Sequence, residues 1–175
     1  MFYRGLLVAL LSVGCNNSTV PWEKNPSRDY PIWIGEGFSD GQRQDLTNSV
    51  RTWEYSLNGF LTFSFVSDEE KGLIRWEAST TKKLEERGPL DPHLTRLGWC
   101  HHQGVGSKLT VATDILESDF QWVALHELGH AFGLSHSGKD TLMCDRNSCS
   151  SPRITESDIN QFHQVWGSSS EGHSH

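Results

Sequence analysis

Residues 126–136 read HELGHAFGLSH, and this stretch constrains the chain more than any other part of the sequence. His126 and His130 are four residues apart, so on a helix they lie one turn apart on the same side and both rings can reach one ion. Gly133 can adopt the positive φ that ends a helix, and the chain can then turn back so that His136 supplies a third nitrogen. Three neutral nitrogen ligands that leave a fourth position for water are typical of a catalytic zinc site.

Glu127 provides the acid–base group that a hydrolytic zinc site needs. It follows the first expected ligand directly, so it can take a proton from a zinc-activated water and pass it to a leaving amine. We therefore expect one zinc ion as cofactor and Glu127 as the catalytic residue. Two other interpretations are an ordinary amphipathic helix with incidental histidines and a zinc-binding domain without activity. The second gives no reason for a glutamate at this position.

The remaining sequence shows alternating strand and helix patterns. Strands are expected at residues 30–34, 61–66, 73–78 and 109–112, and helices at 39–57, 118–132 and 155–167. The first helix begins at a capping box of Ser39 and Gln42. Its apolar stripe, which should face the core, consists of Leu46, Val50, Trp53 and Leu57. Residues 79–106 carry no clear period and are expected to form a long irregular excursion, of the kind that is often functional.

The amino terminus is similar to an export leader. A short basic start is followed by the apolar run Gly5–Val13, the length of the central part of a secretory signal. Residues 1–15 are therefore expected to be a signal peptide or a bacterial lipoprotein leader in which Cys15 receives the lipid. The sequence before Cys15 matches the lipoprotein pattern only in part. Residues 16–29 are expected to be a tether and residues 168–175 a disordered tail. The expected location is secreted or extracytoplasmic.

The cysteines beyond the leader are odd in number. Cys144 and Cys149 enclose a short polar loop, so a local disulfide between them is favoured. Cys100 would then be a free thiol, a metal ligand or a rival disulfide partner, and the sequence does not separate these alternatives.

Charge limits the range of partners. The chain has 22 Asp and Glu against 15 Lys and Arg, a net charge of -7, and its basic residues are scattered. A nucleic-acid-binding face is therefore not expected. No apolar run reaches the roughly 18 to 20 residues of a membrane-spanning helix, so membrane association is expected only through a lipid on Cys15. We expect a monomer whose partner is a peptide or protein substrate.

With these residues in view, the motif resembles the signature of the metzincin zinc peptidases, and Ser137 after the third ligand is similar to the matrixin branch, the matrix metalloproteinase-like catalytic domains. Met143 resembles the Met-turn that supports the zinc site in that family. The resemblance implies an α/β zincin fold over residues 30–167. That fold has a twisted mixed sheet with an antiparallel edge strand, a backing helix, a zinc-binding helix and a C-terminal helix.

The resemblance also implies that the strand before the zinc helix pairs with an extended substrate, which makes Leu109, Thr110, Val111 and Ala112 the candidate substrate-binding residues. The His- and Asp-rich loop that holds further metals in matrixins is not recognisable in residues 79–106, so calcium is not expected. His93, His101 and His102 are interpreted as solvated loop histidines rather than ligands of a second ion. The expected function is a zinc endopeptidase; the alternative is a non-catalytic, zinc-containing surface-binding factor.

Overall fold

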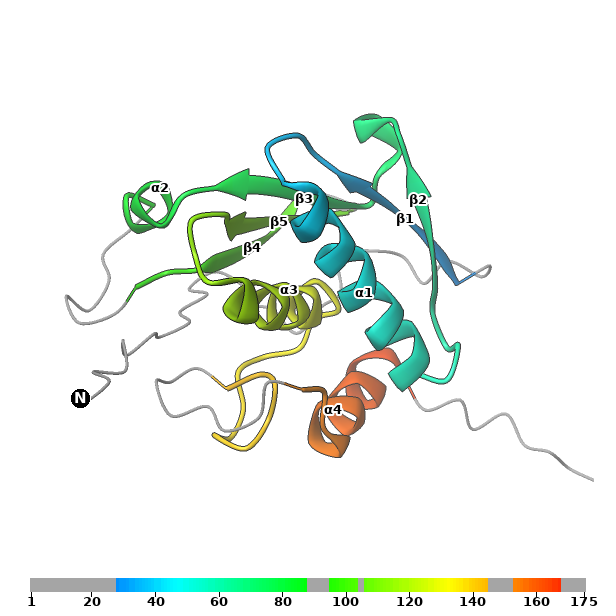
Figure 1. Cartoon of the computed structure of the whole chain (residues 1–175). Coiled ribbons are helices and arrows are strands. Elements are labelled where there is room, and N and C mark those ends of the chain that lie inside the picture. The colour runs from blue at the N-terminus through cyan, green and yellow to red at the C-terminus, as the bar shows by residue number, and fades with distance from the viewer. Residues whose placement is uncertain (1–27, 88–94, 104–105, 145–152, 168–175) are drawn as a thin grey trace, which may run out of the picture.

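The computed structural model describes residues 28–87, 95–103, 106–144 and 153–167 (Figure 1). The expected leader and tail, nearly all of the expected tether, His93 and Cys149 lie outside the described residues. The helices and strands are, in chain order, β1 (Asp29–Ile34), α1 (Asp40–Ser56), β2 (Thr62–Val66), a 3₁₀ turn (Glu69–Lys71), β3 (Ile74–Ser79), α2 (Thr81–Glu85), β4 (Gly98–Gln103), β5 (Gly106–Ala112), α3 (Glu117–Ala131) and α4 (Glu156–Trp166).

The strands form one mixed sheet of five strands in the order β2-β1-β3-β5-β4. β1 is parallel to both β2 and β3, and β3 is parallel to β5. β4 is antiparallel to β5 and forms an edge of the sheet. Helices α1 and α3 lie together on one side of the sheet, and α4 lies beyond them (Figure 1). This arrangement confirms the α/β zincin fold with a mixed sheet and an antiparallel edge strand.

Helix α1 is built as its sequence predicts. The Ser39 side chain accepts from the backbone of Gln42 at 3.2 Å, and the Gln42 side chain accepts from the backbone of Ser39 at 3.0 Å, which completes the capping box. The four residues of the predicted stripe are all buried. The cap and the stripe together orient α1 so that it packs on α3.

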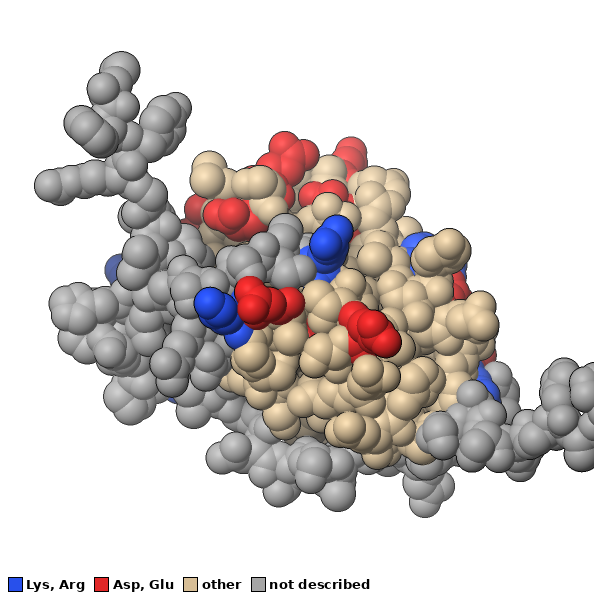
Figure 2. All heavy atoms as spheres, turned by 90° about the horizontal axis from the view of Figure 1, so that it is seen from below, with Lys and Arg blue, Asp and Glu red and all other residues tan. Residues whose placement is uncertain are grey.

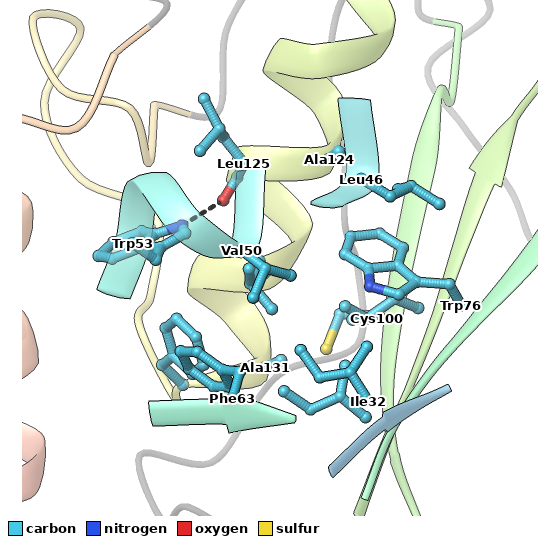
Figure 3. Close-up of a cluster of buried hydrophobic side chains, with 14 of the residues drawn as sticks. Ile32, Leu46, Val50, Trp53, Phe63, Trp76, Cys100, Ala124, Leu125 and Ala131 are labelled. Atoms are coloured by element: carbon cyan, nitrogen blue, oxygen red, sulfur yellow. Dashed lines mark hydrogen bonds between the residues drawn. The ribbon is translucent and has the colours of Figure 1, made fainter. Parts of the chain in front are cut away.

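The core lies between the sheet and the two long helices (Figure 3). Ile32 and Trp76 project from the strands, and Trp53 projects from α1, all of them without solvent exposure. Trp53 also makes a buried hydrogen bond, in which its indole Nε1 donates to the backbone oxygen of Leu125 at 2.9 Å. This hydrogen bond ties the backing helix to the turn of α3 that precedes His126.

Residues 79–106 differ from the prediction of an irregular excursion. The structure places the short helix α2 and the edge strand β4 within them. The sequence of β4, GWCHHQ, lacks an apolar alternation because Gly98 and His102 stand on its inner face and the large apolar Trp99 stands on its outer face. Its strand conformation follows from pairing with β5, a contact that local pattern does not reveal.

The surface carries dispersed charge. On the face shown in Figure 2, Lys and Arg side chains lie apart from one another among acidic and uncharged residues. Ion pairs within the described residues include Arg51 with Glu54 at 2.6 Å and, across β5 and β3, Lys108 with Glu77. No helix in the described segments has both the length and the apolar character to cross a membrane.

Candidate metal centre and active site

The end of α3 gives the histidines their arrangement. The helix stops after Ala131, and Gly133 has a φ of 84°, in the region that favours glycine. The Leu134 N–H bonds back to the oxygen of Gly129 at 3.1 Å, which closes a left-handed C-terminal cap. The chain therefore reverses at the predicted glycine and returns His136 to the side of the helix that carries His126 and His130.

The three predicted ligands converge on one point. Their Nε2 atoms are separated by 3.1 Å between His126 and His130, by 3.1 Å between His130 and His136, and by 3.3 Å between His126 and His136. A tetrahedral zinc ion with nitrogen ligands at about 2.0–2.1 Å requires ligand nitrogens roughly 3.3–3.4 Å apart. Within the described residues, this is the group of His, Cys, Asp and Glu side chains that can hold a metal ion. The donor set therefore fits zinc.

Backbone carbonyls fix the tautomers of two of these rings. Nδ1 of His126 lies 2.8 Å from the oxygen of Leu142, and Nδ1 of His130 lies 2.8 Å from the oxygen of Leu134. A carbonyl oxygen only accepts, so each Nδ1 carries the hydrogen and each Nε2 directs a lone pair toward the ligand cluster. These contacts orient the rings, as hydrogen bonds from ligand histidines to carbonyl oxygens do in zinc sites.

The electrostatics favour neutral imidazole. Burial holds the pKa of His130 well below 6.5, and positive charge on His126 or His136 would lower it further. His130 is therefore unprotonated at neutral pH, the state in which imidazole binds a metal.

Helix α3 is buried on its histidine side as well as on its apolar back. His126 and Glu127 have no exposed surface, and His130 has 2%. The apolar back of the helix consists of Leu125, Leu128 and Phe132, all of which are buried. The sequence pattern does not reveal how deeply the opposite side is covered, because that cover comes from segments outside the helix: β4 lies against Glu127 and Leu142 lies against His126.

Glu127 lies against the first residue of β4. A Cβ added to Gly98 would fall 2.4 Å from Oε1 and 2.6 Å from Cγ of Glu127, so this strand position accommodates the carboxylate only as glycine. Arg96, two residues earlier, is 1% exposed and was not identified from the sequence. Its guanidinium donates to the oxygen of Leu84 at 3.2 Å and lies 4.4 Å from the ring centroid of Trp99. Burial lowers the pKa of Arg96, while the negative charge of Glu127 acts in the opposite direction.

Met143 packs against α3 at Gly129, the residue before His130. Its side chain is fully buried, and its sulfur would be 2.4 Å from a Cβ added to Gly129 of α3. The strand-like bridge between Ser137 and Cys144, with the Ser137 N–H donating to Met143 O at 2.8 Å, joins this turn to the segment that carries His136.

Asp158 on α4 supports the same turn, a role that the sequence did not reveal. Its buried carboxylate accepts from the N–H groups of Leu142 at 3.0 Å and Met143 at 3.2 Å. It also accepts from the N–H of Thr155 at 2.8 Å and from its hydroxyl at 2.6 Å, within the capping box that opens α4. Because Leu142 O in turn holds His126, Asp158 links the terminal helix to the metal centre.

The other cysteines and histidines take separate places. Cys144 is disulfide-bonded, whereas Cys100 is a buried thiol of β4 that is not in a disulfide. The predicted partner Cys149 lies outside the described residues, so the pairing stays a prediction. His101 is exposed on β4, whereas His102 is half-buried on the same strand and contacts Ser107 at 2.8 Å. The interpretation of these two as irregular loop residues is therefore wrong.

The predicted substrate-binding strand must also be corrected. β5 pairs with β3 along one edge and with β4 along the other, so its backbone groups are engaged on both sides. Its candidate residues are also covered, with at most 1% exposure for Leu109, Thr110, Val111 and Ala112. An extended peptide cannot pair with this strand without displacing a neighbour. The antiparallel edge is instead β4, which begins at Gly98, eleven residues before Leu109.

Comparison with known proteins agrees with the geometry. The family model described as matrixin matches residues 38–167, which is more than half of the chain and includes the ligand triad, Glu127 and Met143. No curated protein matches the sequence. Since the matched region contains both the sheet-and-helix architecture and the metal centre, the chain belongs to the matrixin family of zinc metallopeptidases.

Proposed function

We propose that this matrixin is a secreted or otherwise extracytoplasmic zinc endopeptidase that hydrolyses protein substrates through an activated water. The observation that carries the proposal is the convergence of three Nε2 atoms beside a fully buried glutamate on the same helix. The export leader expected at residues 1–15 supports an extracytoplasmic site of action.

The chain's own residues divide the chemistry between them. His126, His130 and His136 would hold zinc, which when bound supplies Lewis acidity that brings the pKa of water to about 7 and polarises a carbonyl. Glu127 takes the proton of the attacking water and delivers it to the amine nitrogen as the peptide bond breaks. The carbonyls of Leu142 and Leu134 keep two of the rings in the required tautomer.

The edge strand β4 offers a means of binding an extended substrate. The Ala112 N–H donates to the oxygen of Leu97 at 2.9 Å, and the same register continues along β4. Odd-numbered residues of β4 therefore exchange hydrogen bonds with β5, whereas even-numbered residues such as Gly98 and His102 direct their backbone groups outward. An added peptide strand would pair with this outer edge and place its scissile bond near Gly98, against which Glu127 packs.

A peptide-library assay tests the proposal. The zinc-loaded full chain is incubated with a mixed peptide library, with and without a chelator, and new amino termini are identified by mass spectrometry. We expect chelator-sensitive cleavage by the unaltered chain. Glu127→Gln should retain one zinc per chain by elemental analysis but lose activity about 10²- to 10⁴-fold, the usual contribution of a general acid–base group.

The same assay separates the proposal from its alternative. A non-catalytic zinc-containing surface-binding factor would bind zinc yet produce no new termini. Full activity in Glu127→Gln would overturn the proposed role of the carboxylate while leaving the metal centre in place.

A further inference from the structure

His102 has an unsatisfied nitrogen on the side of β4 that faces the helices. Its Nδ1 lies 2.8 Å from the hydroxyl oxygen of Ser107. Its Nε2 is buried, and no hydrogen-bond partner lies within reach of it in the described structure. Ring nitrogens removed from water normally have a partner, so this atom lacks a group that would satisfy it. His102 is not part of the ligand triad, whose three Nε2 atoms converge elsewhere.

The contact with Ser107 indicates which nitrogen carries the hydrogen. Ser107 is 2% exposed, so its hydroxyl hydrogen also needs an acceptor. If that hydroxyl donates to Nδ1 of His102, the one group left without a partner is the Nε2–H. If Nδ1–H donates instead, both the hydroxyl hydrogen and the Nε2 lone pair remain unsatisfied. The first arrangement costs less, and it makes Nε2 a hydrogen-bond donor that lacks an acceptor oxygen.

The position of His102 relates it to the active site. It follows Gly98 by four residues, about 13 Å along a strand at roughly 3.3 Å per residue, and side chains four residues apart point to the same face. That face carries Glu127 against Gly98.

We propose that His102 is a specificity-determining residue that selects substrates with an oxygen-bearing side chain, such as Asn, Gln, Asp or Glu, about four residues from the scissile bond. This inference rests on the proposed function. A peptide residue directly opposite His102 on the outer edge of β4 presents its side chain to the same face as His102. His102 as a whole is half-buried, so a small rotation of its ring on peptide binding would bring Nε2 to the surface, where that oxygen can accept the Nε2–H. A leucine there leaves the donor buried and unsatisfied.

The test compares matched peptides. Asn and Leu, which are close in size, are exchanged one position at a time around a cleaved bond, and kcat/KM is measured for each peptide. The unaltered chain should prefer Asn at a position three to five residues from the cut. His102→Ala should reduce that Asn-to-Leu ratio about 3- to 10-fold, the range for one neutral hydrogen bond.

Two further variants separate recognition from structural damage. His101→Ala, on the adjacent residue whose side chain is exposed, should leave the ratio unchanged. His102→Gln, which can place a side-chain amide donor near the original Nε2 position, should retain part of the preference. An equal loss for Asn and Leu peptides in His102→Ala, or a ratio that stays the same at every position, would overturn the inference.

A binding measurement keeps this test distinct from that of the proposed function. The same peptide pair is titrated into zinc-loaded Glu127→Gln with and without His102→Ala, and the ratio of Kd values is compared. Absence of chelator-sensitive cleavage by the unaltered chain would refute the peptidase proposal. Cleavage together with a Kd ratio that does not depend on His102 would refute only the role of His102.

Discussion

Replacing Asp158 with asparagine measures how far the metal centre depends on the terminal helix. In the native carboxylate, Oδ2 accepts from Leu142 N–H and from Thr155, while Oδ1 accepts from Met143 N–H at 3.2 Å. Asparagine can keep its oxygen at the Oδ2 position, but its amino group then faces the N–H of Met143. That buried donor is left without an acceptor, and the remaining bonds lose their charge assistance, so we expect unfolding to become easier by about 2–4 kcal/mol.

Asp158→Asn should also lower the affinity for zinc, because Leu142 lies between Asp158 and the ligand His126. Asp158 accepts from the N–H of Met143, which shares a peptide unit with the Leu142 carbonyl that lies 2.8 Å from Nδ1 of His126 and orients its ring. Loss of groups that orient a metal ligand weakens metal binding by about 10- to 100-fold, and we expect the lower end of that range because the link is indirect. Urea denaturation of the zinc-free chain measures the first effect, and competition with a chelator measures the second.

Thr155→Val is the matched control. It removes the hydroxyl that bonds to Asp158 at 2.6 Å and caps α4, which should cost about 0.5–2 kcal/mol of stability. It leaves the bonds from Asp158 to Leu142 and Met143 in place, so zinc affinity should stay the same. An Asp158→Asn chain that binds zinc as tightly as the unaltered chain, or a Thr155→Val chain that loses as much affinity, would refute the proposed link.

Three other changes test different parts of the structure. Gly98→Ala should displace the Glu127 carboxylate, because the new Cβ would lie 2.4 Å from Oε1, and we expect kcat/KM to fall about 100-fold with unchanged zinc content. Trp53→Phe should lower the free energy of unfolding by about 2–3 kcal/mol in urea, since it removes buried volume and the 2.9 Å bond to Leu125 O, and unaltered stability would contradict this. Burial is the main cause that raises the pKa of Asp45, so the folded state binds this proton more tightly than the unfolded state and loses stability as pH rises above 3.8. Asp45→Asn should therefore raise Tm at pH 7 but not at about pH 3. An equal gain in Tm at both pH values would exclude this cause.

Features that depend on local spacing could be predicted from the sequence. The four-residue interval between His126 and His130 fixes their common side on any helix, and the glycine three residues later marks the reversal that the structure has at φ 84°. The capping box at Ser39 is equally local, because its two hydrogen bonds join residues three apart. In each case the interacting residues are close in the sequence, so their spacing alone predicts that they will be in contact.

The edge strand β4 could not be identified in this way. Its inner face contains Gly98 and His102 and its outer face contains Trp99, so apolar alternation, the usual sign of a half-buried strand, is lacking. A weaker signal exists in Gly104 and Gly106, because a short glycine-containing stretch between two candidate strands indicates a hairpin. Without that strand, the resemblance places the antiparallel edge at residues 109–112, which lie in β5 and are enclosed by two neighbouring strands in the structure.

Hydrogen bonds between residues far apart in the sequence determine how the ligand rings are oriented, whereas the motif determines which atoms bind the metal. The motif supplies three nitrogen donors, whereas the carbonyl of Leu142, sixteen residues from His126, determines which nitrogen of that ring carries the hydrogen. Asp158, a further sixteen residues along, accepts from the Met143 N–H, which belongs to the same peptide unit as that carbonyl. Donor identity and donor orientation therefore have separate origins in the chain. Substitution of a ligand should abolish zinc binding, whereas substitution at Asp158 should weaken it with all three donors still present.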